Sequence, residues 1–193
     1  MSCYVADVVA VLDDAGIERA AMIGYSQGAR VGYAVAAAHQ ERLAGLVGLD
    51  SVPGPEERPA DLRADAATVL ADGTRAAIEK IDSTESEAPP AWLLDHLCAT
   101  DPASLAGAYE AFATAPPFWP AAGRITVPTL FLLGVCEDEQ DWWALGQAAA
   151  SAMPRGQAVA LNGLGHLQAF WRTDLALPPI KRFLAELRAA AGA

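Results

Sequence analysis

The chain has 193 residues, 53% of them hydrophobic, which is enough for one domain with a buried core and short for two. Its formal net charge of -11 argues against nucleic acid as a partner, because phosphates require clusters of Lys and Arg. Cys3, Cys98 and Cys136 are odd in number and lack Cys-x-x-Cys spacing, so neither a disulfide framework nor a zinc site is predicted. We therefore expect reduced cysteines in a cytoplasmic protein with no metal and no cofactor.

Helical and extended patterns alternate over the first fifty residues. Val5, Val8, Val9 and Leu12 share one helical face, which predicts an amphipathic helix ending near Gly16. The elements expected next are a buried strand over 20–23, an Ala-rich helix over 27–39 and a second buried strand over 43–49. Such alternation is typical of βαβ units and predicts a parallel sheet. No signal peptide is expected, and no apolar run approaches the roughly 20 residues that span a bilayer.

The segment 53–123 differs from the rest of the chain because Pro-rich joints separate short helical patterns. The expected helices cover 62–70, 75–81, 92–98 and 104–112. We interpret this segment as a helical insertion, which leaves 1–52 and 124–193 as the α/β core.

The sheet is expected to resume after the insertion. An apolar strand over 127–133, a helix over 142–153, and a strand over 157–161 follow in that order. The final helix carries Ile180, Phe183, Leu184 and Leu187 at the spacing of one buried face.

The segment Gly24-Tyr25-Ser26-Gln27-Gly28 matches the pattern G-x-S-x-G, and it lies between a predicted strand and a predicted helix. In such a nucleophile elbow, a sharp reversal exposes the serine hydroxyl at the head of the helix, whose dipole favours developing negative charge. We expect Gly24 and Gly28 to provide the clearance for this turn. The Gln27 amide is then a candidate oxyanion donor. Without partners for Ser26, this segment would be only a Gly-rich turn.

A serine nucleophile needs a base, and the chain has three histidines. His39 ends the Ala-rich helix and is expected to be a solvated cation, and His96 lies in the insertion. His166 follows Gly163-Leu164-Gly165 just after the last strand, where it can reach the edge of the sheet. His166 is therefore the predicted base.

The orienting acid has several candidates. Asp138 follows the strand that ends at Gly134 and is the preferred one, because Ser, Asp and His then occur in the order of one known triad arrangement. Glu137 and Glu139 flank it, and Asp50 follows the strand before the insertion, so these carboxylates remain alternatives.

These motifs resemble the α/β-hydrolase superfamily, in its serine esterase and haloperoxidase-like branch with a helical cap. The resemblance covers the helix, strand and elbow over 7–28, the segment from Val127-Pro128-Thr129-Leu130 to the acid at 138, and Gly-x-Gly-His with its helix over 163–184. In that family the acid stands three residues after the strand-ending glycine, a position that Glu137 occupies here. The insertion matches the family only in its position as a cap.

The resemblance also implies strands that would come before the first helix, so we expect an N-terminally truncated sheet of the α/β-hydrolase type. One absent strand would lie beside residues 20–23, and one absent loop would supply the second oxyanion amide. An exposed apolar strand edge is normally covered in proteins. We therefore expect a homo-oligomer, or a complementing chain, to cover the edge at 20–23.

The sequence predicts a hydrolase of small carboxylic esters that uses Ser26, His166 and an acid. A serine at the elbow disfavours dehalogenase and epoxide hydrolase chemistry, which use Asp there in this superfamily. Lactone hydrolysis, C–C bond hydrolysis and perhydrolysis remain open on the same residues. The alternative is a degenerate hydrolase that serves as a binding or assembly module. The cap aromatics, which include Trp92, Tyr109 and Phe112, could line a substrate pocket or pack the cap onto the sheet.

Overall fold

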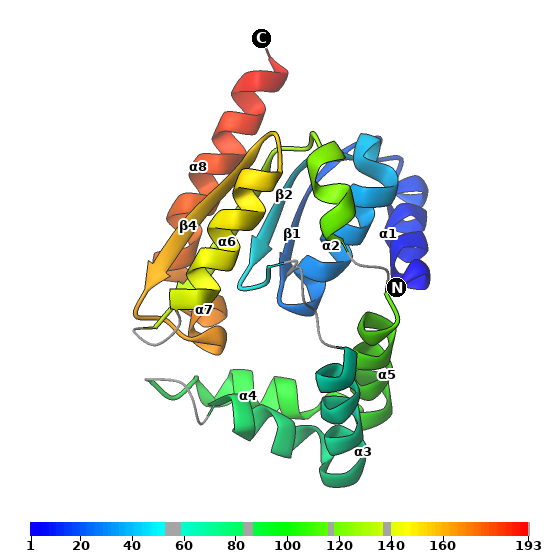
Figure 1. The fold of residues 1–193 in the computed structure, drawn as a ribbon, viewed down its shortest axis with the longest axis vertical. Helices are drawn as coiled ribbons and strands as arrows, with labels where there is room; N and C mark the ends of the chain where they lie inside the picture. Colours follow the sequence, from blue (N-terminus) through cyan, green and yellow to red (C-terminus); the bar gives the residue numbers. More distant parts are fainter. Residues whose placement is uncertain (53–58, 83–86, 116–117, 137–139, 193) are drawn as a thin grey trace.

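The structure, a computed structural model, describes residues 1–52, 59–82, 87–115, 118–136 and 140–192. Helices and strands alternate through the core, and a group of helices separates β2 from β3 (Figure 1). The elements are α1 (Ser2–Asp14), β1 (Ala20–Tyr25), α2 (Gln27–His39), η1 (Gln40–Arg42), β2 (Leu43–Leu49), α3 (Pro59–Asp82), α4 (Ala91–Cys98), α5 (Pro102–Ala113), η2 (Trp119–Arg124), β3 (Thr129–Val135), α6 (Gln140–Ala152), β4 (Gly156–Asn162), α7 (His166–Trp171) and α8 (Thr173–Ala191).

The four strands form one parallel sheet in the order β1-β2-β3-β4. This confirms the predicted parallel α/β architecture. The register pairs Tyr25 with Leu49 and Leu49 with Leu132, so the carboxyl ends of the strands meet at one edge of the sheet. Strands β2 and β3 are almost wholly buried, which explains their continuous apolar sequences.

Helices cover both faces of the sheet (Figure 1). Phe131 and Leu133 of β3 join the core with α1, α2 and α6, while Leu130 and Leu132 point to the opposite core beneath α8. This alternation follows from the two-residue period of a strand. Within the described residues, no helix has both the length and the apolar character needed to cross a bilayer.

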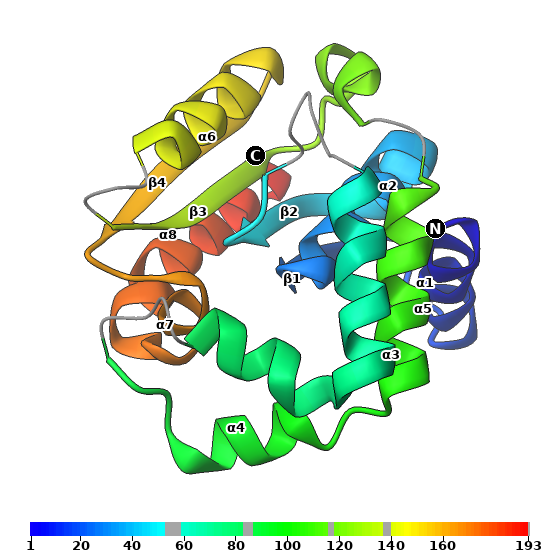
Figure 2. The ribbon, with the colours of Figure 1, turned by 60° about the horizontal axis from the view of Figure 1, so that its bottom comes forward.

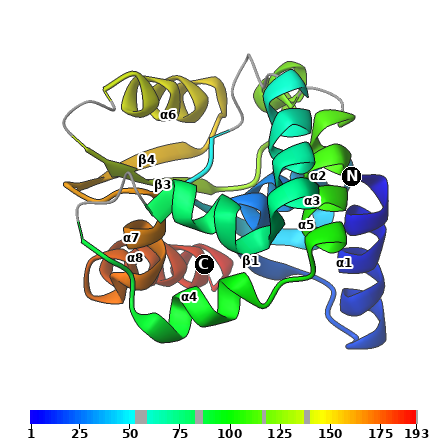
Figure 3. The same cartoon turned by 90° about the horizontal axis from the view of Figure 1, so that it is seen from below.

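Helices α3, α4 and α5 lie beyond the carboxyl ends of the strands, and the second half of α3 extends toward α7 (Figure 2; Figure 3). Ala66, Val69 and Ala106 form a small core between α3 and α5. The helices expected at 62–70 and 75–81 form one segment, α3, that kinks at Gly73, where φ is +85°. Trp119 and Ala122 of η2 pack against the core that β3 forms with α2 and α6, so the insertion ends against the α/β core.

Strand β1 forms one edge of the sheet, and in the described part of the chain only β2 pairs with it. The strand continues to Tyr25, two residues beyond the predicted end. Its Ile23 side chain is 50% exposed, which is unusual for an isoleucine in a parallel sheet. The described residues therefore contain the exposed edge of β1, which we expected another chain to cover.

Candidate active site

The turn between β1 and α2 holds Ser26 in a strained conformation, with φ of 49° and ψ of -114°. Few non-glycine residues adopt positive φ, and those that do are common at active sites. A Cβ added at Gly24 would lie 2.4 Å from the carbonyl of Gly28, so the turn requires glycine at position 24. At Gly28, an added Cβ would meet no atom of the described residues within 4 Å, apart from its chain neighbours and the backbone of its own helix. The expectation that both glycines provide clearance is therefore wrong for Gly28.

His166 reaches the same edge of the sheet as the first residue of α7. The loop before it turns at Gly163, where φ is +77°, and crosses directly over Gly134 at the end of β3. A Cβ at Gly134 would lie 2.6 Å from the Leu164 carbonyl oxygen, so only glycine allows this close crossing. The Gly165 amide donates to the Gln168 side chain at 2.9 Å, which closes the first turn of α7.

Ser26, His166 and Asp50 form one hydrogen-bonded line. His166 Nε2 lies 3.1 Å from Ser26 Oγ, and His166 Nδ1 lies 2.5 Å from Asp50 Oδ2. The tautomer with a proton on Nδ1 donates to the Asp50 carboxylate and leaves Nε2 free to accept the serine proton. The acid next to the base is thus Asp50, one of the alternatives that the sequence left open, while Asp138 and Glu137 lie outside the described residues.

Asp50 is held firmly at the end of β2. Its side chain is buried, with 5% of its surface exposed, and its backbone φ is +47°. The second carboxylate oxygen, Oδ1, accepts the Gly134 amide proton at 2.8 Å. Hydrogen bonds to both oxygens offset the cost of burying a carboxylate. Asp50 can therefore orient the imidazole and stabilise its charged form.

Comparisons with known proteins identify the chain. The model of a family described as "Alpha/beta hydrolase family" matches residues 2–174. The chain belongs to this alpha/beta hydrolase family. A search of the curated proteins gives no match.

Solved structures of the alpha/beta hydrolase type share this fold. MenH from S. aureus has 20% identity and a TM-score of 0.77, and the match covers 95% of this chain and 74% of that one. A thermophilic esterase from Thermogutta terrifontis has 21% identity, a TM-score of 0.79 and coverages of 95% and 71%. The enol-lactonase from Burkholderia xenovorans has 23% identity, a TM-score of 0.76 and coverages of 94% and 71%.

Tyr25 supports the histidine of this family member, a role that the sequence analysis did not foresee. Its hydroxyl donates to the His166 carbonyl oxygen at 3.0 Å, and its ring centroid lies 5.0 Å from that of the imidazole. The ring centroid of Phe170 of α7 lies 4.8 Å from that of Tyr25. The sequence shows that Tyr25 stands next to the elbow serine. It does not show that Tyr25 contacts His166, which lies 141 positions further along the chain.

Tyr33 of α2 supports the acid from the other side. Its hydroxyl donates to the Ser51 carbonyl oxygen at 2.6 Å, next to Asp50. A Cβ at Gly48 would lie within 1.9 Å of this hydroxyl, so a glycine in β2 makes room for it. Complete burial raises the pKa of Tyr33 well above its ordinary value.

The remaining predicted site residues lie as follows. Gln27 begins α2, and its amide, like those of a helix's first turn generally, has no acceptor within the helix. It can therefore face a developing oxyanion. His39 is paired with Glu41 at 3.4 Å at the far end of α2, and His96 is exposed on the cap helix α4, so neither approaches Ser26.

Some aromatic side chains of the cap are buried, and others are exposed. Trp92 is 62% exposed, whereas Phe112 is buried and stacks on Tyr4 of α1. Tyr109 packs in the small core of the cap, where burial raises its pKa. Trp142 and Trp143 of α6 pack against the core.

Proposed function

We propose that the chain is a serine hydrolase that acts on small carboxylic esters, with Ser26 as nucleophile, His166 as base and Asp50 as acid. The observation that carries this proposal is the continuous line from Ser26 Oγ through the imidazole to the buried Asp50 carboxylate. A strained serine at the head of a helix adds to it, because this arrangement exposes the hydroxyl to a bound carbonyl.

In the proposed first step, Ser26 Oγ attacks the ester carbonyl carbon while its proton passes to His166 Nε2. The negative charge on the carbonyl oxygen is stabilised by the Gln27 amide and by the dipole of α2. Collapse of this intermediate breaks the bond to the alcohol, which leaves with the proton from Nε2. Water then attacks the acyl-serine through the same base, releases the carboxylic acid and restores Ser26.

Two relatives favour an ester or a lactone as the substrate class. A thermophilic esterase and an enol-lactonase are among the similar structures, and enzymes of both kinds act on a carbonyl bonded to oxygen. Ester hydrolysis is the first proposal because it needs only the Ser26–His166–Asp50 line and water. Lactone hydrolysis follows the same steps with a cyclic substrate.

A degenerate hydrolase that serves as a binding module is the second candidate. The observation in its favour is that Gln27 is the one oxyanion donor assigned in the described part of the chain. Loss of an oxyanion donor typically lowers kcat by about a hundredfold to a thousandfold. This candidate predicts an intact triad geometry with little or no turnover.

A fluorophosphonate probe separates the two candidates. We expect covalent labelling of Ser26 in the unmodified protein and hydrolysis of short p-nitrophenyl esters. Ser26→Ala should abolish labelling and lower kcat by about 10⁶-fold. Ser151→Ala, which alters an exposed serine on α6, is the matched control and should label normally. Absence of both labelling and turnover in the folded protein would overturn the hydrolase proposal.

A further inference from the structure

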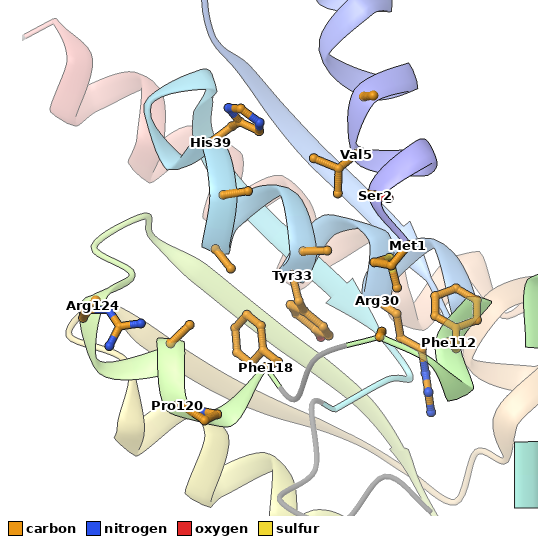
Figure 4. A pocket seen from close by; sticks show the side chains of 16 residues that line it. Met1, Ser2, Val5, Arg30, Tyr33, His39, Phe112, Phe118, Pro120 and Arg124 are labelled. Atoms are coloured by element: carbon orange, nitrogen blue, oxygen red, sulfur yellow. The ribbon is translucent and has the colours of Figure 1, made fainter. Parts of the chain in front are cut away.

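A cavity lies between α1, α2 and η2. It has a volume of about 570 Å³, and it is lined by the start of α1, by α2, by the end of α5 and by η2 (Figure 4). None of Ser26, Asp50 and His166 lines it. Its volume falls in the usual range for pockets that hold small organic ligands, which is about 300–1,000 Å³. We call it the α2 pocket.

The walls of the α2 pocket are mainly apolar. Tyr33 and Phe118 lie in its middle, and Val5 contributes from α1 (Figure 4). Ala34 and Ala37 of α2 also line it. The Tyr33 and Phe118 rings pack with their centroids 5.3 Å apart, so this part of the wall is preformed. Such a surface suits an alkyl or aryl tail rather than a sugar or a small ion.

The charge of the pocket is opposite to that of the chain. The chain carries 24 acidic and 13 basic residues, yet the described residues that line the pocket include Arg30 and Arg124 and no Asp or Glu. The two arginines lie at opposite ends (Figure 4). Arg30 is engaged with the Phe112 ring at 5.6 Å, and His39 is paired with Glu41. Arg124 is therefore the cation best placed to meet a ligand.

The backbone that carries Arg124 is fixed. Gln40 donates from Nε2 to the Arg124 carbonyl oxygen at 3.4 Å and accepts from the Thr126 amide at 3.0 Å. The end of η2 is thus tied to the end of α2, so the guanidinium starts from a defined position beside the apolar walls. A planar guanidinium pairs with a carboxylate through two parallel hydrogen bonds.

We propose that the α2 pocket binds a monocarboxylate with an apolar tail, such as a medium-chain fatty acid. The carboxylate pairs with Arg124, and the tail lies against Phe118, Tyr33 and the alanines of α2. This inference does not depend on Ser26 chemistry, since the pocket contains none of the triad residues.

Calorimetric titration with decanoate, kept below its micelle concentration, tests the proposal. We expect one decanoate per chain. Decanol, which keeps the tail, and propionate, which keeps the charge, should each bind at least about tenfold more weakly, because each lacks one half of the recognition. Equal affinity for decanol and decanoate would overturn the role of Arg124.

Variants locate the site. Arg124→Gln should weaken decanoate binding about tenfold and leave decanol unchanged. The control is Arg155→Gln, an exposed arginine beside Pro128 and Phe183 on another part of the surface, and it should bind as the unmodified protein does. Unchanged decanoate affinity in Arg124→Gln would contradict the proposal.

Filling the pocket provides an independent check. Ala34→Phe should abolish binding, and Ala38→Phe, at an exposed lining position where folding is not at risk, should do the same. Nuclear Overhauser contacts from decanoate protons to the Val5 and Ala34 methyl groups would support the site. Contacts to Leu167, beside the triad histidine, would instead place the ligand at the candidate active site and overturn the inference.

Discussion

Ser26 and Asp50 have positive φ values of 49° and 47°, and they follow the paired strand ends Tyr25 and Leu49. Each such conformation costs about 1–3 kcal/mol, so the surrounding structure must hold both residues in place. The Ser26 amide donates to the Leu49 carbonyl oxygen at 2.9 Å, and the Asp50 amide donates to Leu132 at 2.8 Å. The backbone ladder thus continues through the two strained residues and aims their side chains at His166.

The choice of Asp50 as the acid can be tested directly. Asp50→Asn should lower kcat by about 10⁴-fold, because an amide favours the wrong imidazole tautomer and cannot stabilise the imidazolium. The double variant Glu137→Gln, Asp138→Asn should stay within a few-fold of the unmodified protein. The measurement is kcat on a p-nitrophenyl ester. A large loss in the double variant with none in Asp50→Asn would return the role to the loop after β3.

Tyr25 is a positioning residue whose effect should be seen in the kinetics. Its ring lies beside the imidazole, and an aromatic ring favours a neighbouring cation. Tyr25→Leu should therefore lower kcat on a p-nitrophenyl ester by about tenfold with little change in KM, whereas Tyr25→Phe, which keeps the ring, should stay within a few-fold. Steady-state kinetics of the three proteins give both parameters. Equal kcat values would show that the ring only fills space.

The sequence identified Ser26 and His166 because each has a local signal: a strand-to-helix turn with small neighbours, and a Gly-rich loop after the last strand. The acid had no such signal. Four carboxylates follow strands whose ends meet at one edge, and chain spacing cannot tell which of them faces the imidazole. In the structure Asp50 Oδ2 faces the imidazole, and the Gly134 amide holds Asp50 Oδ1. The role of Tyr25 was hidden for the same reason.

At the scale of elements, the elbow depends on one close approach between β1 and α2. Gly24 lies against the backbone of Gly28, and no side chain fits between them. The strand and the helix at this turn were predictable, since residues 20–23 are a short apolar run and residues 27–39 are rich in Ala without Pro. The kinked α3 was less so, because Asp72-Gly73 reads as a break between two helices.

Paired substitutions at the elbow test this geometry. Gly24→Ala should lower the free energy of unfolding by about 2 kcal/mol or more and slow fluorophosphonate labelling, because the new methyl group collides with backbone. Gly28→Ala should be neutral, or stabilising by up to about 1 kcal/mol, as it replaces a helical glycine beside open space. Urea unfolding and labelling rates give both quantities. Similar losses in the two variants would contradict this difference.

Tyr33 links the stability of α2 to pH. Because burial raises its pKa in the folded state, its contribution is fully present below its ordinary pKa of about 10. Above that pH, the unfolded chain loses the proton and the folded chain keeps it, so stability falls. Tyr33→Phe should cost about 1 kcal/mol near neutrality through the lost bond to Ser51. It should also flatten the decline above pH 10 in urea titrations.

Tyr109 provides the comparison for this pH effect, because burial also raises its pKa. Tyr109→Phe should remove a smaller part of the alkaline decline, since Tyr109 is less deeply buried than Tyr33. An unchanged alkaline slope in Tyr33→Phe would show that its hydroxyl ionises as freely in the folded chain as in the unfolded one.

At the scale of the whole molecule, the sheet order repeats the chain order, and β1 forms an edge with Ile23 half exposed. Exposed edges of this kind favour pairing with another strand. The family resemblance implied a neighbour for this strand, and we therefore expected another chain to cover its edge. No local sequence pattern indicates which chain covers the β1 edge, because the cover depends on how chains assemble.

We predict that copies of the chain associate through this edge. Light scattering should give a mass of at least two chains. Ile23→Lys should shift the protein toward monomer, because a charge on the edge opposes strand pairing. Val11→Lys alters an apolar residue on α1 that is 67% exposed, and it should leave the mass unchanged. A monodisperse monomer in the unmodified protein would refute this prediction.

Ser26 Oγ and His166 Nε2 meet across 140 positions of the chain, whereas Ser26 and Asp50 directly follow β1 and β2. The proposed nucleophile and acid therefore depend on the pairing of β1 with β2. The proposed base joins them only when β4 has paired with β3 and α7 has formed. In the proposed hydrolase, a chain cut before β4 would hold the serine and the carboxylate without a base.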